Sequence, residues 1–83
     1  MKPGGYTNDE EAYFQRVGER IRYFRKLRNY SSYQSFAYAH NIHLSQYGLY
    51  EQGKNLNIAT LRRILQALQV SHKEFFDSFD EII

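Results

Sequence analysis

The chain has 83 residues, of which 42% are hydrophobic, and a net charge of only +2. That length holds one domain with a single modest core, and the lack of cysteine excludes disulfides, thiol nucleophiles and cysteine-ligated zinc. No apolar run approaches the roughly 20 residues that cross a bilayer, and the first residues lack the apolar core of a secretory signal. These features predict a soluble, cytoplasmic, single-domain protein without membrane contact.

Charges are segregated along the chain. Residues 13–30 carry six Lys or Arg and one Glu, whereas residues 71–83 carry one Lys and four Asp or Glu. A basic half followed by an acidic end suits a polyanionic partner. A solvated helix face that is rich in arginine explains the same charges equally well, so the charge pattern leaves both interpretations open.

A long helix is predicted first. Its start follows Thr7, because Thr7-Asn8-Asp9-Glu10 matches a capping box. Apolar residues then recur at spacings of three and four as far as Asn29, which predicts a buried stripe and a basic outer face. Residues 1–6, which contain Pro3-Gly4-Gly5, are expected to form a flexible arm.

Four shorter helices are predicted after the long one. Ser32, Asn57 and Ser71 can cap the starts of three of them, and the remaining one opens at His43 or Leu44. Two of their ends are marked by residues that tolerate a left-handed backbone, Asn41 and Gly53. No segment shows the alternation typical of a strand, so the sequence predicts an all-α fold of five helices.

Four segments spread over these helices resemble one protein family. They read V-G-E-R-I-R-Y-F-R-K-L-R, F-A-Y-A-H-N-I, L-S-Q-Y-G-L-Y-E-Q-G-K and A-T-L-R-R-I-L-Q-A-L-Q-V-S. Together they resemble the phage-repressor, or Cro/XRE-like, helix-turn-helix family over about residues 17–76. The resemblance implies a lambda-repressor-like DNA-binding domain over residues 7–76. It also implies a sequence-specific transcriptional regulator, specifically a repressor, that places helix 44–52 in the major groove of double-stranded DNA.

DNA contacts are implied by the same resemblance. The residues that would meet base edges are Leu44, Ser45, Gln46, Gly48, Leu49 and Gln52. The residues that would hold phosphates are Tyr33, Lys54, Asn55 and Asn57. Gln and Ser can form hydrogen bonds with bases, whereas Leu can contact only thymine methyl groups, so the implied preference leans toward A·T pairs and relies on DNA shape.

The resemblance also implies a structural ion pair between Arg25, on the first helix, and Glu51, at the end of the third. Such a partly buried pair fixes orientation more than it adds stability.

The C-terminal tail, residues 77–83, is expected to be helical. Its apolar positions continue one helical face that begins in the fifth helix, formed by Phe75, Phe79, Ile82 and Ile83. This face is a candidate contact for a homodimer, which would place two recognition helices about one DNA turn apart. Alternatively, the tail folds back on the first helix and covers Tyr13 and Phe14.

Other functions are weighed against DNA binding. No glycine-rich phosphate loop or catalytic constellation is recognisable, so an enzyme is not expected. His40 and His43 straddle a turn without a nearby carboxylate, so neither a metal site nor a cofactor is expected. His40 is expected to be a half-buried, hydrogen-bonded histidine. The remaining alternative is a protein-interaction or antitoxin-like module that keeps this fold with weak or no base reading.

Overall fold

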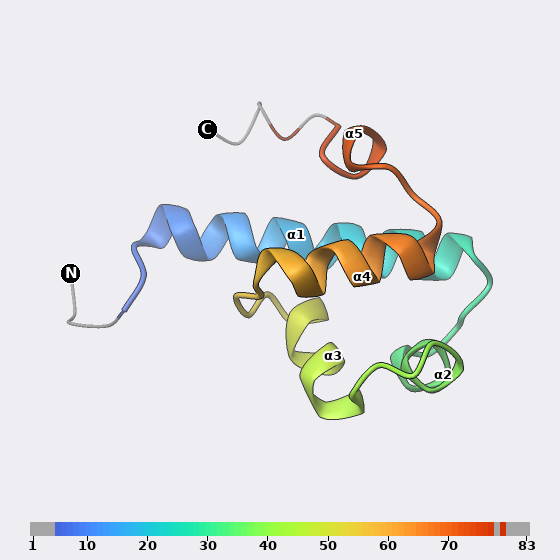
Figure 1. Ribbon diagram of the computed structural model, residues 1–83. Coiled ribbons are helices and arrows are strands. Elements are labelled where there is room, and N and C mark those ends of the chain that lie inside the picture. Colours follow the sequence, from blue (N-terminus) through green and yellow to red (C-terminus); the bar gives the residue numbers. More distant parts are fainter. Residues whose placement is uncertain (1–4, 78, 80–83) are drawn as a thin grey trace.

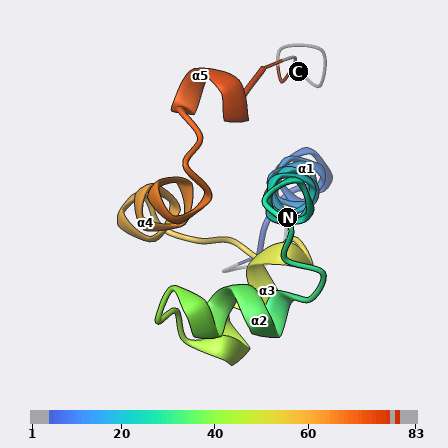
Figure 2. The same cartoon turned by 90° about the vertical axis from the view of Figure 1, so that its right-hand side faces the viewer.

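The computed structural model describes residues 5–77 and 79, which contain five helices and no strand. The helices are α1 (Asn8–Leu27), α2 (Tyr33–Ala39), α3 (Leu44–Glu51), α4 (Ile58–Leu68) and α5 (His72–Phe75). Helices α1 and α4 lie side by side, with α2 and α3 on one side of this pair and α5 on the other (Figure 1; Figure 2). None of these helices is both long enough and apolar enough to cross a bilayer. The predicted all-α, five-helix fold is confirmed.

Four of the five helix starts have side-chain caps at the predicted residues, whereas His43, which precedes α3, forms no side-chain cap. The Thr7 hydroxyl accepts a 3.1 Å hydrogen bond from the Glu10 amide, and the Glu10 carboxylate accepts one of 2.8 Å from the Thr7 amide. A second capping box of this kind opens α5 at Ser71. The Ser32 hydroxyl oxygen and the Asn57 side-chain oxygen each accept one hydrogen bond from a backbone amide and thereby cap α2 and α4. Each cap satisfies amide groups that have no partner within the first helical turn.

Four of the described residues have a left-handed backbone, and one of them is Gln69 (φ 58°), which ends α4. Asn29 (φ 69°) follows α1, Asn41 (φ 54°) lies between α2 and α3, and Gly53 (φ 96°) follows α3. Asparagine tolerates this region better than most residues, and glycine has no Cβ to clash there. The predictions for Asn41 and Gly53 are confirmed. Helix α1 ends at Leu27, slightly before the predicted end, because the chain already reverses at Asn29.

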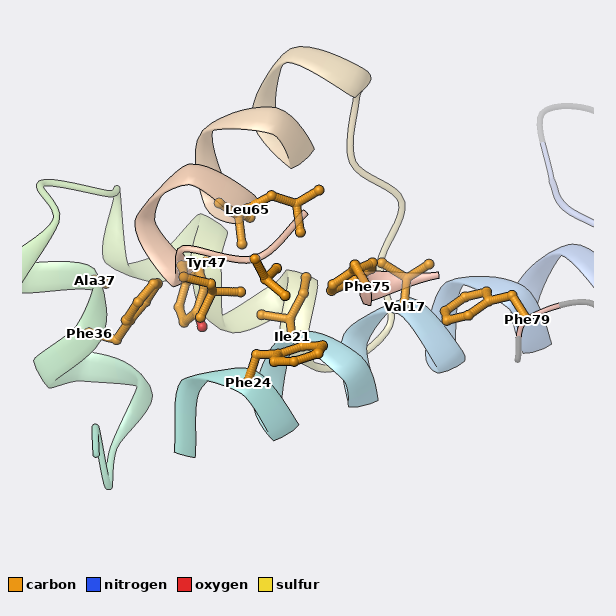
Figure 3. Close-up of a cluster of buried hydrophobic side chains, with 12 residues drawn as sticks. Val17, Ile21, Phe24, Phe36, Ala37, Tyr47, Leu65, Phe75 and Phe79 are labelled. Carbon is orange, nitrogen blue, oxygen red and sulfur yellow. The ribbon is translucent and has the colours of Figure 1, made fainter. Parts of the chain in front are cut away.

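All five helices contribute to one hydrophobic core (Figure 3). Tyr47 is the largest fully buried side chain and extends from α3 into this core. Its ring centroid lies 5.2 Å from that of Phe36 on α2. Ala37, which follows Phe36 in the sequence, is also fully buried in this core. One side of α3 is therefore fixed in the core.

The C-terminal segment folds back on α1. Phe79 lies in a 3-10 turn after α5, so the predicted continuous helical face is interrupted. Phe75 and Phe79 are 0% and 4% exposed, and the Phe79 ring lies 5.6 Å from the ring of Tyr13. The expectation that these two phenylalanines form a dimer contact is wrong, because they complete the core of the single chain. Ile82 and Ile83 lie outside the described residues.

Arg20 of α1 and Arg28, the residue at its C-terminal cap, attach other helices to α1. Arg20 donates hydrogen bonds of 3.0 and 2.8 Å to the last carbonyls of α5. Arg28 donates bonds of 2.7 and 3.0 Å to carbonyls at the end of α4. Carbonyls at a helix C-terminus lack intrahelical partners and carry partial negative charge, which suits a guanidinium. Much of the basic charge of residues 13–30 is therefore used inside the fold.

Candidate nucleic-acid interface

A buried ion pair locks the C-terminal end of α3 to α1. The Arg25 Nε atom lies 2.7 Å from Glu51 Oε2, and its Nη2 atom lies 3.1 Å from Oε1. Arg25 also donates a 2.7 Å bond to the Tyr30 carbonyl. The hydrogen bonds donated to Glu51 raise the pKa of the Arg25 guanidinium above its ordinary value. A two-point contact of this kind fixes the direction of both partners, so the structure contains the ion pair that the resemblance implies.

Gly18 lets α3 approach α1 at the same place. A Cβ atom at Gly18 would lie 2.6 Å from the Tyr50 carbonyl oxygen and 2.7 Å from that of Glu51. Both obstacles are backbone atoms, which cannot rotate away as the end of a side chain can. The only sequence signal for this contact is a glycine in the middle of a helical pattern.

Beyond this fixed end, α3 exposes an uncharged side. Its exposed residues are Leu44, Ser45, Gln46 and Leu49, followed by the C-cap residue Gln52. Leu44 and Leu49 are 46% and 40% exposed. Glu51 is the one charged residue of α3, and it is buried against Arg25. The exposed side therefore offers amide, hydroxyl and apolar groups, without a cation.

Gly48 does not belong to this exposed side. It is buried, and a Cβ atom there would lie 3.0 Å from Cε2 of the Tyr33 ring. The expectation that Gly48 meets a base edge is wrong, because a ring from α2 covers it. Tyr33 itself is 36% exposed at the start of α2 and remains a candidate phosphate donor.

The loop after α3 carries the other candidate phosphate contacts. Lys54 and Asn55 are exposed, and the Lys54 amide donates a 3.0 Å bond to the Leu49 carbonyl. The Asn55 Nδ2 atom donates a 2.8 Å bond to the hydroxyl of Tyr6, which the sequence places in a flexible arm. Asn57 Oδ1 accepts a 2.8 Å bond from an amide in the first turn of α4. The Asn57 oxygen is thus used as a helix cap, which leaves its amide nitrogen for a phosphate.

A further cation on α1 lies beside this region. The Arg22 side chain is 52% exposed, and its Nε atom lies 3.8 Å from Glu51 Oε1. Arg22 and Lys54 therefore place positive charge next to the C-terminal end of α3, where a polyanion would meet it.

His40 lies among aromatic rings at the end of α2. Its ring centroid is 4.6 Å from Phe36 and 5.6 Å from Tyr30. The residue is half-buried as expected, but its Nε2 atom has no hydrogen-bond partner within the part of the chain that the structure describes. That part also contains no cluster of three His, Cys, Asp or Glu side chains able to hold a metal ion.

Comparison with protein families agrees with this geometry. A family model described as helix-turn-helix, of the Cro/C1 type that includes XRE and lambda-repressor-like domains, matches residues 21–75. The match spans the last third of α1 and all of α2 to α5, including Arg25 and Glu51. No curated protein and no solved structure matches the chain significantly. The family is a DNA-binding regulatory family and not an enzyme family. The chain therefore belongs to the Cro/C1-type helix-turn-helix family of DNA-binding domains.

Proposed function

We propose that the protein is a sequence-specific transcriptional repressor that places α3 in the major groove of double-stranded DNA. A groove about 12 Å wide admits one α-helix. The observation that carries the proposal is the fixed presentation of α3. The Arg25–Glu51 pair and the Gly18 contact hold its C-terminal end, while the side from Leu44 to Gln52 is exposed. A reading element held rigidly by its supporting residues is what precise recognition requires.

Phosphate contacts would supply most of the affinity, and base contacts the specificity. We assign phosphate binding to Tyr33, Lys54, Asn55 and Asn57. Arg22 is added as a cation that the sequence did not single out. Base reading is assigned to the exposed residues of α3 and to Gln52, with Gly48 removed from that set.

A binding titration with a random-sequence duplex, measured at two salt concentrations, tests the proposal. Affinity is expected to fall steeply as salt rises, because bound phosphates release counterions. Lys54→Ala should weaken binding to all sequences alike and lower the slope of log affinity against log salt by about 1. Lys73→Ala is the matched control, since Lys73 is an exposed cation on α5, across the molecule from α3. Absence of binding at low salt would overturn the proposal.

A protein-interaction or antitoxin-like module is the second candidate function. The exposed Leu44 and Leu49, together with the lack of a cation on α3, favour it. The same titration separates the two functions, because a module that has lost DNA binding would show no salt-dependent affinity for duplex.

We further propose that the repressor acts as a homodimer, which would place two copies of α3 about 34 Å apart on one face of DNA. Because Phe75 and Phe79 are buried, we assign the contact to another apolar surface. A hollow between α1 and α4 is lined by apolar residues that include Phe14, Leu56, Ile58 and Leu61. Ile58, at its edge, is 82% exposed.

Sedimentation tests this assembly. The wild-type chain is expected at twice its 9.9 kDa mass. Ile58→Asp should return it to the monomer, because a carboxylate in an apolar contact is costly to desolvate. Leu27→Asp, at an exposed leucine of α1 outside the hollow, should leave the dimer intact. A monomeric wild type, or a dimer that survives Ile58→Asp, would contradict this assembly.

A further inference from the structure

The segment before α1 is attached to the loop after α3. The Tyr6 ring lies edge-on to the Phe14 ring, with centroids 4.9 Å apart, and the Tyr6 hydroxyl accepts a 2.8 Å hydrogen bond from Asn55 Nδ2. The loop itself runs against α1, because a Cβ atom at Gly53 would lie 2.9 Å from the Cα atom of Gln15. Figure 1 shows that the chain enters α1 from the side on which α3 lies. Tyr6 therefore lies beside the loop to which we assign phosphate binding.

The bond between Tyr6 and Asn55 brings two hydrogen-bond donors together. A side-chain amide nitrogen carries two hydrogens, and a phenol is both a donor and an acceptor. Asn55 donates one hydrogen to Tyr6, so its second amide hydrogen and the hydroxyl hydrogen of Tyr6 can serve another acceptor. A hydroxyl that accepts a hydrogen bond becomes a stronger donor, because linked hydrogen bonds polarise one another. The pair is thus a two-donor site for an anion, and the exposed cation Lys54 precedes Asn55 in the chain.

The fold gains little from the Tyr6 hydroxyl. Tyr6 is 49% exposed and Asn55 is also exposed, so water competes for both groups. A hydrogen bond that replaces bonds to water adds little to the free energy of unfolding. The packing of the Tyr6 ring against Phe14 needs no hydroxyl. The hydroxyl group therefore contributes more to a ligand site than to the stability of the domain.

We infer that Tyr6 and Asn55 together bind one phosphate of the DNA backbone. This inference rests on the function proposed above and extends its phosphate-binding surface to the segment before α1. Tyr6 precedes the residues that the family model matches, 21–75, so membership of the family assigns it no role. Tyrosine hydroxyls and asparagine amides are among the groups that bind phosphate oxygens in protein–DNA complexes. Because such contacts carry no sequence information, Tyr6 adds affinity for every duplex alike.

Tyr6→Phe tests the hydroxyl, because the variant keeps the ring that packs against Phe14. The full chain and this variant are titrated with a random-sequence duplex at two salt concentrations. A hydrogen bond to a charged group corresponds to about a tenfold change in affinity, so the variant should bind about tenfold more weakly. Its slope of log affinity against log salt should equal that of the wild type, because a neutral phenol releases no counterion, whereas Lys54→Ala lowers that slope.

Tyr23→Phe is the matched control for removal of a phenol hydroxyl. Tyr23 is a 54% exposed tyrosine of α1 that lines a hollow beside α5, on the other side of the molecule from α3. This variant should bind duplex as the wild type does. Both phenylalanine variants should melt at the temperature of the wild type, so that weaker binding by Tyr6→Phe is not caused by unfolding.

Asn55→Ala tests whether the two groups hold the same phosphate. Each single substitution should weaken binding. The double variant, Tyr6→Phe with Asn55→Ala, should bind more weakly than either single variant, but less weakly than the product of the two losses predicts. Groups that share one partner are coupled in this way, because removal of one loosens the contact of the other.

Four results would overturn the inference. Wild-type affinity of Tyr6→Phe would exclude the hydroxyl contact. An effect of Tyr6→Phe that vanishes in the Asn55→Ala background would show that the hydroxyl only orients Asn55, and losses that multiply fully would place the two groups on separate phosphates. These three results leave DNA binding intact. Failure of the wild type to bind duplex at low salt would reject the proposed function and this inference with it.

Discussion

At the residue scale, α3 is oriented by buried polar groups together with apolar packing. The Arg25–Glu51 pair follows from the family resemblance, because both residues lie at positions of the motif. The hydrogen bonds that Arg20 and Arg28 donate could not be predicted from the sequence, because their acceptors are backbone carbonyls 40 to 55 residues away. Every residue has a backbone carbonyl, so the sequence indicates a basic helix but not which of its cations form hydrogen bonds to carbonyls of other helices.

Removal of Glu51 tests the ion pair. Glu51→Ala would leave the Arg25 charge buried without its partner, so unfolding in urea should show a loss of about 3–5 kcal/mol. Glu19→Ala is the control, because Glu19 is exposed and lies 4.0 Å from Arg16. It should cost less than about 1 kcal/mol. Similar losses for the two variants would show that the buried pair does not hold α3.

Because of Tyr47, the free energy of unfolding is expected to depend on pH in the alkaline range. Burial raises the pKa of its phenol above the ordinary value of about 10. A raised native pKa means that stability is fully present below about pH 10 and is lost as pH rises further. Tyr47→Phe should therefore reduce the alkaline fall in urea midpoint, whereas Tyr38→Phe, at a 92% exposed position, should not. An identical fall in wild type and Tyr47→Phe would contradict this account.

At the element scale, helix starts were the most predictable feature. The side chains of Thr7, Ser32, Asn57 and Ser71 bond to amides three residues ahead, so local sequence is sufficient to indicate them. Contacts between elements were less predictable. The ring of Tyr33 over Gly48 joins two helices, and no spacing rule places an aromatic ring on a particular glycine.

Two glycine substitutions test how α3 meets its neighbours. Gly18→Ala should destabilise the fold by about 1–3 kcal/mol, because its new methyl group meets backbone carbonyls. Gly48→Ala meets only the movable ring of Tyr33, and the helix propensity of alanine, worth about 1 kcal/mol, offsets that contact. Urea unfolding should thus separate the two variants. Equal stability would contradict the close approach of α1 and α3.

At the scale of the whole molecule, the sequence left two places open for the tail. The spacing of Phe75 and Phe79 predicts an apolar face, but the same spacing serves a dimer contact or a covered core. The contact between Phe79 and Tyr13 shows that Phe79 belongs to the covered core, because it joins the end of the described chain to α1. Sequence periodicity indicates which residues are buried and not which surface buries them.

Phe79→Asp distinguishes these two roles. A carboxylate in place of a 4% exposed ring should lower the melting temperature markedly, because it loses apolar contacts and buries charge. The sedimenting mass of the remaining folded protein should equal that of the wild type. A stable fold with half the wild-type mass would instead restore the tail as a dimer contact.

The central claim is that α3 and the loop after it form the DNA-binding surface. Backbone amide signals of the ¹⁵N-labelled full chain, followed by NMR during titration with a random-sequence duplex at low salt, test this most directly. The largest shift changes are expected in residues 44–49 and 54–57, with little change in α5. Shift changes concentrated on α4 and α5, or none at all at low salt, would contradict the claim.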